Sequence, residues 1–300
     1  MRIDSKIYFC VYSVIHSLLY YTKIILNPAH HEIKVKSIDD TIDEMRYKSC
    51  IRFGDGEMQM IIGNGICYQS YYPELSRRLG DILTSDANNN LLICIPDVFG
   101  KLDNWNSYAR YIWSGYRYHS YNTWQKLTKP TVYYGNAHAT RPYVDLPKSL
   151  KKNADLFYTK LRGIWYDKDV VIVEGVNTRN GVGNNLFSCT KSIERIICPS
   201  RNAFCKYTDI FSTVINLVRK DKLILISLGP TGKILAYDLF NIGYHVIDIG
   251  HIDNDYEWYI HAVMHPINLN NNKHFSEESD KSITYCIDEA YHNQIIAIIE

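Results

Sequence analysis

The sequence predicts an α/β fold: a mostly parallel sheet with helices on both faces, preceded by an amphipathic N-terminal helix. Short apolar runs bounded by turn residues alternate with longer stretches of helical period, which is the pattern of βαβ units. The chain has 300 residues, 46% hydrophobic and 22% charged, so it can bury a core and is not disordered. The predicted strands are Leu91–Pro96, Thr131–Gly135, Val170–Gly175, Leu223–Gly229 and Tyr244–Gly250, and the clearest helices are Tyr207–Arg219 and Gly232–Asn241.

Charge and cysteine content argue against a nucleic-acid-binding protein and against a zinc-binding or C-x-x-C redox protein. Lys and Arg total 33 against 32 Asp and Glu, a formal net charge of +1, whereas a duplex-binding protein carries a basic excess. The eight cysteines form no C-x-x-C pair and no zinc-ligand spacing with nearby histidines. We therefore expect no nucleic-acid partner and a reducing compartment, the cytoplasm.

The N-terminal segment is predicted to be a helix. Residues 7–22 carry no formal charge, and their apolar side chains recur on one stripe until Pro28 stops the helix. We expect it to pack on the body of the domain or on a second copy in a homodimer. A helix lying on the inner face of the membrane is the alternative, disfavoured because only Lys6 and Lys23 supply positive charge. Residues 1–45 are assigned as this helical extension with a polar linker over 33–43, and residues 46–300 as one domain.

The segment from Leu223 to Gly250 is predicted to form strand, glycine turn, helix and strand. Gly229 and Gly232 would let backbone amides, including that of Thr231, approach a phosphate at the positive end of the helix. Asp248 ends the second strand, where dinucleotide folds place a ribose-binding acid. The glycine fingerprint is incomplete, so an ordinary βα turn is an equal interpretation.

Two carboxylates flank a glycine in Arg52-Phe-Gly-Asp-Gly-Glu57. In an extended chain Asp55 and Glu57 would project to the same side, and Gly54 would leave room for a ligand near the backbone. Such a pair can hold Mg²⁺ or Mn²⁺ while substrate phosphates fill the free positions, and Arg52 can pair with the same phosphates. A solvated turn with a strand-end arginine is the competing interpretation.

Two more acidic segments follow predicted strands. Glu174 ends an apolar run, so it should emerge at the carboxyl edge of the sheet, where α/β ligands bind. Asp248, His251 and Glu257 lie close together with aromatic residues, and aromatic rings beside acids suit sugar recognition. A polar loop leading into a helix with acidic first-turn residues is the alternative.

Together and in this order, these stretches resemble the bacterial GT-D fold glycosyltransferases, a family once known as a domain of unknown function. The resemblance covers about residues 45–262. It rests on Arg52-Phe-Gly-Asp-Gly-Glu57, Ile95-Pro-Asp-Val-Phe99, Arg141-Pro-Tyr143, Val173-Glu-Gly175, Gly181-Val-Gly-Asn184 with Leu186-Phe187, Lys191-Ser192-Ile193, Cys198-Pro199, Leu228-Gly-Pro-Thr231 with Leu235-Ala-Tyr-Asp-Leu239, and Asp248-Ile-Gly-His251 with Tyr256-Glu-Trp258. Asn185, where the family pattern has Asp, and Gly232, where it has Ala, are departures.

The resemblance implies a Rossmann-like sheet and metal-dependent transfer of a hexose, glucose or galactose, from a UDP-sugar. The acceptor would be a glycan or glycoprotein in bacterial surface glycan synthesis. Asp55 and Glu57 would be the D-x-E motif that holds Mn²⁺ (or Mg²⁺). The nucleotide sugar would be bound by Arg52, Gly54, Arg141, Gly229, Thr231 and Gly232.

A base must also take the proton of the acceptor hydroxyl. The candidates are Glu257, Asp248 and Glu174, in that order, with His251 as a second-choice base or metal ligand.

Two other functions fit part of the pattern. A Rossmann-type methyltransferase or dehydrogenase would use Gly229–Gly232 and Asp248, but it leaves Arg52–Glu57 without a role. A non-catalytic scaffold of a polysaccharide-assembly complex would bind the nucleotide sugar without turning it over.

Overall fold

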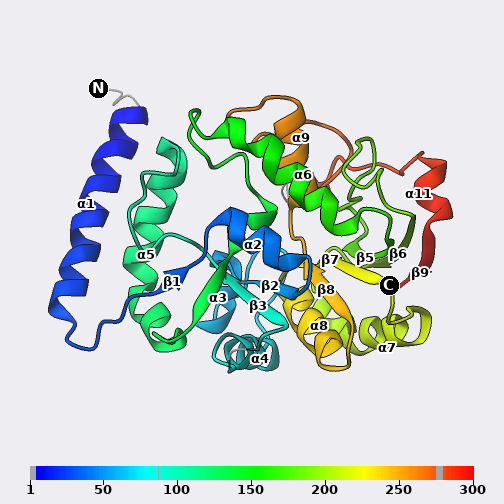
Figure 1. Ribbon diagram of the computed structural model, residues 1–300, viewed down its shortest axis with the longest axis horizontal. Helices are drawn as coiled ribbons and strands as arrows, with labels where there is room; N and C mark the ends of the chain where they lie inside the picture. Colours follow the sequence, from blue (N-terminus) through cyan, green and yellow to red (C-terminus); the bar gives the residue numbers. More distant parts are fainter. Residues whose placement is uncertain (1–4, 87, 275–279) are drawn as a thin grey trace.

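The computed structural model describes residues 5–86, 88–274 and 280–300 (Figure 1). Within them nine strands form one parallel sheet in the order β1-β4-β3-β2-β8-β7-β5-β6-β9. The strands are β1 (Lys34–Val35), β2 (Ser49–Arg52), β3 (Leu91–Ile95), β4 (Tyr133–Asn136), β5 (Asp169–Gly175), β6 (Ser192–Cys198), β7 (Leu223–Ser227), β8 (His245–Asp248) and β9 (Ile295–Ile298). The helices are α1 (Ser5–Leu26), α2 (Ile38–Met45), α3 (Asp55–Ile61), α4 (Pro73–Leu83), α5 (Ser107–Leu127), α6 (Ala154–Trp165), α7 (Tyr207–Leu217), α8 (Gly229–Asn241), α9 (Ile252–Ile260) and α11 (Glu289–Asn293).

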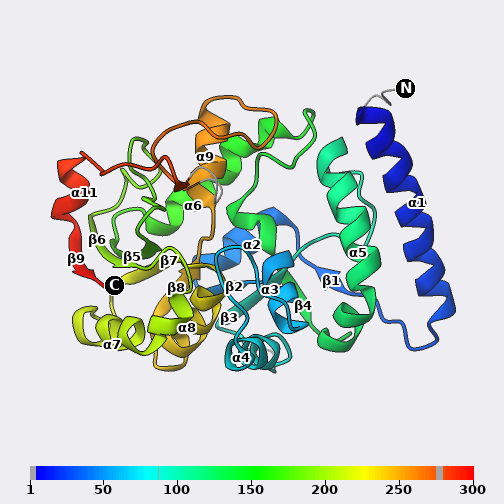
Figure 2. The same cartoon turned by 180° about the vertical axis from the view of Figure 1, so that it is seen from behind.

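Helices cover both faces of the sheet, which confirms the predicted α/β fold (Figures 1 and 2). Residues of α4, α7 and α8 join one apolar core, and residues of α2, α6 and α9 join the other. The central strands are buried on both faces; the side chains of 170–173 in β5 are fully buried. Continuous Val and Ile runs form such strands because a parallel sheet between two helix layers has no solvated face.

The strand order changes direction beside β2. This strand pairs with β3 on one side and with β8 on the other, although β2 and β8 lie almost 200 residues apart. Helices on opposite faces leave a crevice at such a point, at the carboxyl ends of the strands. Arg52, Gly175, Ser227 and Asp248 stand at these ends.

The linker predicted over 33–43 is wrong. This segment contains β1, which pairs with β4, and most of α2. Ser37 caps α2 by accepting a hydrogen bond from the Asp40 N–H (3.0 Å), a common way for a helix to begin. Ile42 and Met45 are fully buried, so α2 belongs to the core of the domain.

Candidate active site

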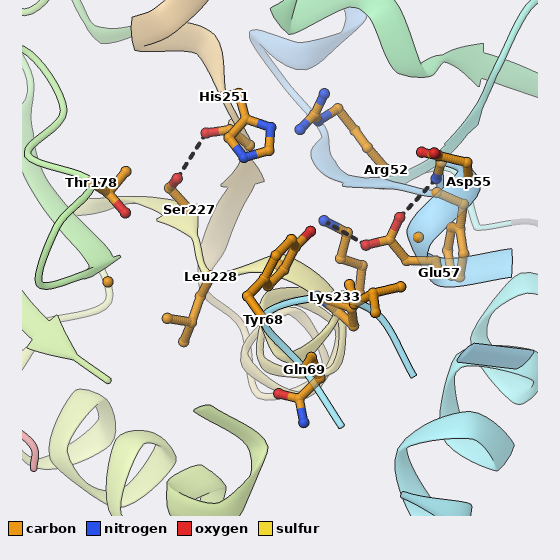
Figure 3. A pocket seen from close by; sticks show the side chains of 18 of the residues that line it. Arg52, Asp55, Glu57, Tyr68, Gln69, Thr178, Ser227, Leu228, Lys233 and His251 are labelled. Carbon is orange, nitrogen blue, oxygen red and sulfur yellow. Dashed lines mark hydrogen bonds and ion pairs between the residues drawn. The ribbon is translucent and has the colours of Figure 1, made fainter. Parts of the chain in front are cut away.

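A cavity of about 380 Å³ opens at the carboxyl ends of β2, β5, β7 and β8 (Figure 3). Its walls come from the loops that follow these strands, from the first turns of α3 and α8, and from α5. The lining residues used below are Arg52, Gly54, Asp55, Glu57, Tyr68, Trp113, His138, Arg141, Gly229, Lys233, His251 and His274.

Arg52 lines this cavity, and Asp248 lies beneath it. The Arg52 N–H donates to Oδ2 of Asp248 (3.1 Å), and its Nε–H donates to the Asp248 carbonyl oxygen (2.9 Å). Nη1 of Arg52 donates to the carbonyl oxygen of Ala137 (2.9 Å). These bonds between neighbouring strand ends fix the guanidinium at the cavity, where it can meet an anionic ligand.

The extended chain predicted for Asp55 and Glu57 is wrong: both residues lie in the first turn of α3. Glu57 turns back and accepts a hydrogen bond from the Gly54 N–H (2.8 Å), the return half of a capping box. Residues two apart on a helix do not face each other. Asp55 is therefore exposed at the cavity while Glu57 is buried.

Lys233 joins the acids of α3 and β8. Its ammonium lies 3.2 Å from Oε1 of Glu57 (Figure 3). It also lies 3.1 Å from Oδ2 of Asp248, and all three side chains are buried. Burial lowers the pKa of Lys233, but Asp248 and Glu57 outweigh it and raise the pKa above its ordinary value. Burial raises the pKa of Asp248, yet Lys233 and Arg52 bring it below its ordinary range. Lys233 and Asp248 thus stabilise each other in their charged forms.

The glycine turn before α8 is partly covered by Tyr68. Gly229 has a left-handed φ of +52°, and a Cβ there would lie 2.6 Å from Cε2 of Tyr68. Thr231 is fully buried and donates to Oε1 of Gln69 (3.2 Å), and a Cβ on Gly232 would meet Ile226 at 2.8 Å. Of the three predicted nucleotide-binding residues in this turn, Gly229 lines the cavity, whereas Thr231 and Gly232 pack beneath it.

Comparison with known proteins decides the family. The model of the glycosyltransferase GT-D fold matches residues 50–278. The chain belongs to the GT-D glycosyltransferase family. It is 43% identical over 273 residues to a probable glycosyl transferase Gly of Streptococcus gordonii, covering 90% of this chain and 39% of that protein. It is 38% identical over 281 residues to the glycosyltransferase GlyD of Streptococcus pneumoniae serotype 4, covering 93% and 34%.

Solved structures agree with this assignment. A glycosyltransferase (DUF1792) from Streptococcus sanguinis superposes with a TM-score of 0.85 at 40% identity, over 90% of this chain and all of that chain. A second, of the domain of unknown function 1792 with a distinct glycosyltransferase fold, gives 0.86 at 36% identity, over 95% and 98%. This chain spans well under half the length of the curated relatives, so the activity of those whole proteins does not transfer to it directly.

Only one of the four predicted catalytic residues of this GT-D chain lines the cavity: His251. Asp248 lies beneath Arg52 and Lys233. Glu174 is fully buried; Oε2 accepts from Asn180, and Oε1 pairs with Arg195. It anchors the loop after β5.

Glu257 is likewise not part of the cavity wall. Its Oε1 accepts from Nδ2 of Asn184 (2.6 Å) and lies 3.1 Å from the buried Lys273 ammonium. Lys273 also pairs with Asp253 (2.6 Å). Among the described lining residues the carboxylates are Asp55 and Glu57, so neither Glu174 nor Glu257 reaches a ligand here.

Two of the histidines at the GT-D cavity, His138 and His251, are neutral. Burial, followed by the charges of His274 and Arg141, lowers the pKa of His251 to about 3. Burial lowers the pKa of His138 to about 4, against a smaller opposing effect of Asp145. A neutral imidazole can accept a hydrogen bond from a hydroxyl group.

A divalent cation fits this site only with help from a ligand. Both Glu57 oxygens are engaged, by the Gly54 N–H and by Lys233, which leaves exposed Asp55 as the free carboxylate. Within the described ranges no three His, Cys, Asp or Glu side chains gather as a metal cluster. Mg²⁺ and Mn²⁺ accept one or two carboxylates when phosphate oxygens and water complete the shell, so the donor set is compatible with a cation brought in by a diphosphate.

Several lining residues were not predicted from the sequence: Tyr68, Trp113, His138, Lys233 and His274. Lys233 could have been found from the sequence, because it is a lone lysine inside the apolar segment Gly232–Leu235 and a buried lysine must be paired with an acid. Tyr68 could not be found in this way. It sits in a turn closed by a bridge between Ile66 and Gln69, and only the folded chain brings it onto α8.

Proposed function

We propose that this GT-D glycosyltransferase transfers a hexose, glucose or galactose, from a UDP-sugar to a glycan or glycoprotein acceptor of the bacterial surface. One observation carries the proposal: two cations, the half-buried Arg52 and the buried Lys233, border the same cavity as the exposed carboxylate of Asp55. Fixed cations beside a free acid suit a diphosphate together with its metal ion. The sugar nucleotide is made in the cytoplasm, and we place the enzyme there.

The diphosphate is expected between α3 and α8. Both helices begin at the cavity, at Gly54 and Gly229, and helix N-termini favour anions. Arg52 contributes a guanidinium already fixed by two hydrogen bonds, to the carbonyl oxygens of Asp248 and Ala137, so little entropy is lost on binding. Arg141 adds a second guanidinium at the wall, 3.4 Å from Asp145.

We propose Mn²⁺ (or Mg²⁺) as the cofactor, held by Asp55 with Glu57 behind it. Bound there, the ion would neutralise negative charge that develops on the departing UDP. Lys233 contacts the same acidic cluster from inside the protein, through ion pairs with Glu57 and Asp248. Asp55 remains the carboxylate free to meet a ligand.

The acceptor sugar is expected on the side of His251. This imidazole is neutral and can accept the hydrogen bond of an acceptor hydroxyl, and it stacks with His274 at a ring separation of 6.0 Å. Tyr68 and Trp113 offer ring faces to the apolar side of a pyranose. Membership of the GT-D family overturns the alternative of a methyltransferase or dehydrogenase.

A donor screen tests the proposal. UDP release is measured from UDP-glucose, UDP-galactose and UDP-N-acetylglucosamine, with and without Mn²⁺ and with a glycopeptide acceptor. Asp55→Asn should lower turnover on the order of 100-fold, whereas the matched control Asp81→Asn, an exposed acid on α4 paired with Arg77, should not. Binding of a UDP-sugar without turnover of any donor would identify the non-catalytic scaffold instead.

A further inference from the structure

The helix α1 packs on its own chain through its polar face. It lies along α5 at one edge of the molecule (Figures 1 and 2). Nη2 of Arg117 donates to Oγ of Ser17 (2.8 Å), and Nζ of Lys23 donates to the Tyr118 carbonyl oxygen (3.0 Å). The buried Tyr20 hydroxyl donates to the carbonyl oxygen of Phe99 (3.0 Å). These specific bonds fix which face of α1 turns inward.

The apolar face of α1 therefore points outward. We call it the α1 stripe; its members are exposed by 40–82% and are Ile7, Val11, Val14, Ile15, Leu18, Leu19, Ile25 and Leu26. An ordinary surface helix does the reverse and turns its apolar stripe to the core. The inverted arrangement indicates that something outside this chain covers the stripe.

The exposed area matches a protein interface. Eight aliphatic side chains, each about half exposed, present on the order of 800 Å², more than the 300–600 Å² typical of a monomer's largest apolar patch and about one partner's share of a standard interface. By length and composition alone, residues 7–26 could also cross a membrane. The bonds of Ser17, Tyr20 and Lys23 to the body of the protein oppose such a crossing.

The pattern within the stripe favours another helix over lipid. Ile7, Val11, Val14 and Leu18 follow each other at intervals of four, three and four residues, and Ile25 comes seven later; this is the spacing of helices that interlock side by side. A helix that lies on a membrane carries Lys and Arg beside its apolar face. Among the described side chains of 7–26 the only basic residue other than histidine is Lys23, and its ammonium is bound inward at Tyr118.

We propose that the α1 stripe is the interface of a homodimer, in which α1 packs against α1 of a second copy around a two-fold axis. A stripe of this kind is self-complementary, because the same uncharged side chains can meet across the axis. The α5 helices of both copies flank the pair, which makes a four-helix arrangement. This inference does not depend on the proposed donor or metal.

The mass of the full chain in solution tests the proposal. Light scattering after size exclusion, at 1–100 µM, should give twice 34.9 kDa, and Val14→Glu with Leu18→Glu should halve it. The matched control places Glu at Leu156 and Ile215, exposed aliphatics on α6 and α7, and should stay dimeric. Circular dichroism shows whether each variant is folded.

Three results would overturn the proposal. If the wild-type protein is monomeric throughout this concentration range, no second copy covers the α1 stripe. A dimer that survives the Val14 and Leu18 substitutions has its interface elsewhere. A monomer that sediments with phosphatidylcholine and phosphatidylglycerol vesicles, and loses this binding in the double variant, assigns the stripe to lipid.

Discussion

Lys233 is the residue on which the acidic side of the cavity depends, because it neutralises two buried carboxylates from different elements. Lys233→Met should lower the free energy of unfolding by about 3 kcal/mol or more, since a buried charge that loses its partner is not resolvated. Urea denaturation followed by tryptophan fluorescence measures this. The control Lys222→Met removes a more exposed pair with Glu194 and should cost about 1 kcal/mol or less. Equal losses in both variants would contradict the role of Lys233.

The neutral histidines predict how stability changes with pH. His138 and His251 have pKa values of about 4 and about 3 in the folded protein, against about 6.5 in the unfolded chain. Between these values the unfolded chain binds more protons, so the free energy of unfolding falls as pH falls below 6.5, by up to about 1.4 kcal/mol per unit for each histidine.

Melting temperatures from pH 7.5 to pH 5 check this prediction. His138→Gln with His251→Gln should flatten the decline, whatever its effect on stability at pH 7.5. Curves of wild type and variant that run parallel would show that these histidines are not the groups responsible.

The residue types of the site were visible in the sequence, but their roles were not. The sequence points to Arg52, Asp55 and Glu57 together, because acids, glycine and arginine in one short segment suit the binding of phosphate and a metal ion. The exact placement depends on the first turn of α3, which exposes Asp55 and turns Glu57 toward Lys233. Gly54 with glutamate three residues later is a capping-box spacing and could have predicted this helix.

At the level of elements, the turn between β7 and α8 holds Tyr68 at the cavity. Gly229→Ala should both strain the left-handed backbone and displace the Tyr68 ring, which lies 2.6 Å from the new Cβ. We expect UDP affinity to fall about tenfold, or 1.4 kcal/mol, measured by calorimetry. Gly183 has φ +77° with nothing within 4 Å of a Cβ, so Gly183→Ala carries the strain alone. Equal affinity for UDP in the two variants would show that Tyr68 has no part in binding.

Elements with strong periodicity were predictable, and those with weak signals were not. The buried strands β5 and β7 and the helix α8 follow from continuous apolar runs and a glycine turn. The helical period of α1 was equally clear, yet periodicity shows which side chains share a face and not which face turns inward. Hydrogen bonds to Arg117, Phe99 and Tyr118 decide that, and these partners lie about 80–100 residues away.

For the whole molecule, alternation of strands and helices predicts a parallel sheet and a site at its carboxyl edge. It does not predict the order of the strands across the sheet. The pairing of β2 with β8 brings Arg52 to Asp248, although the two residues are 196 positions apart in the sequence. Nor does the alternation predict that Glu174 and Glu257 are held away from the cavity by Arg195 and Lys273. The GT-D family model and the solved relatives support the resulting architecture over most of the chain.

A crystal structure with UDP and Mn²⁺ tests the central claim most directly. We predict the diphosphate between Arg52 and the first turn of α8, with the metal on Asp55. The structure has a second cavity, lined by residues 181–185 and by Ala290 and Tyr291 of α11; a nucleotide bound there instead would contradict the account.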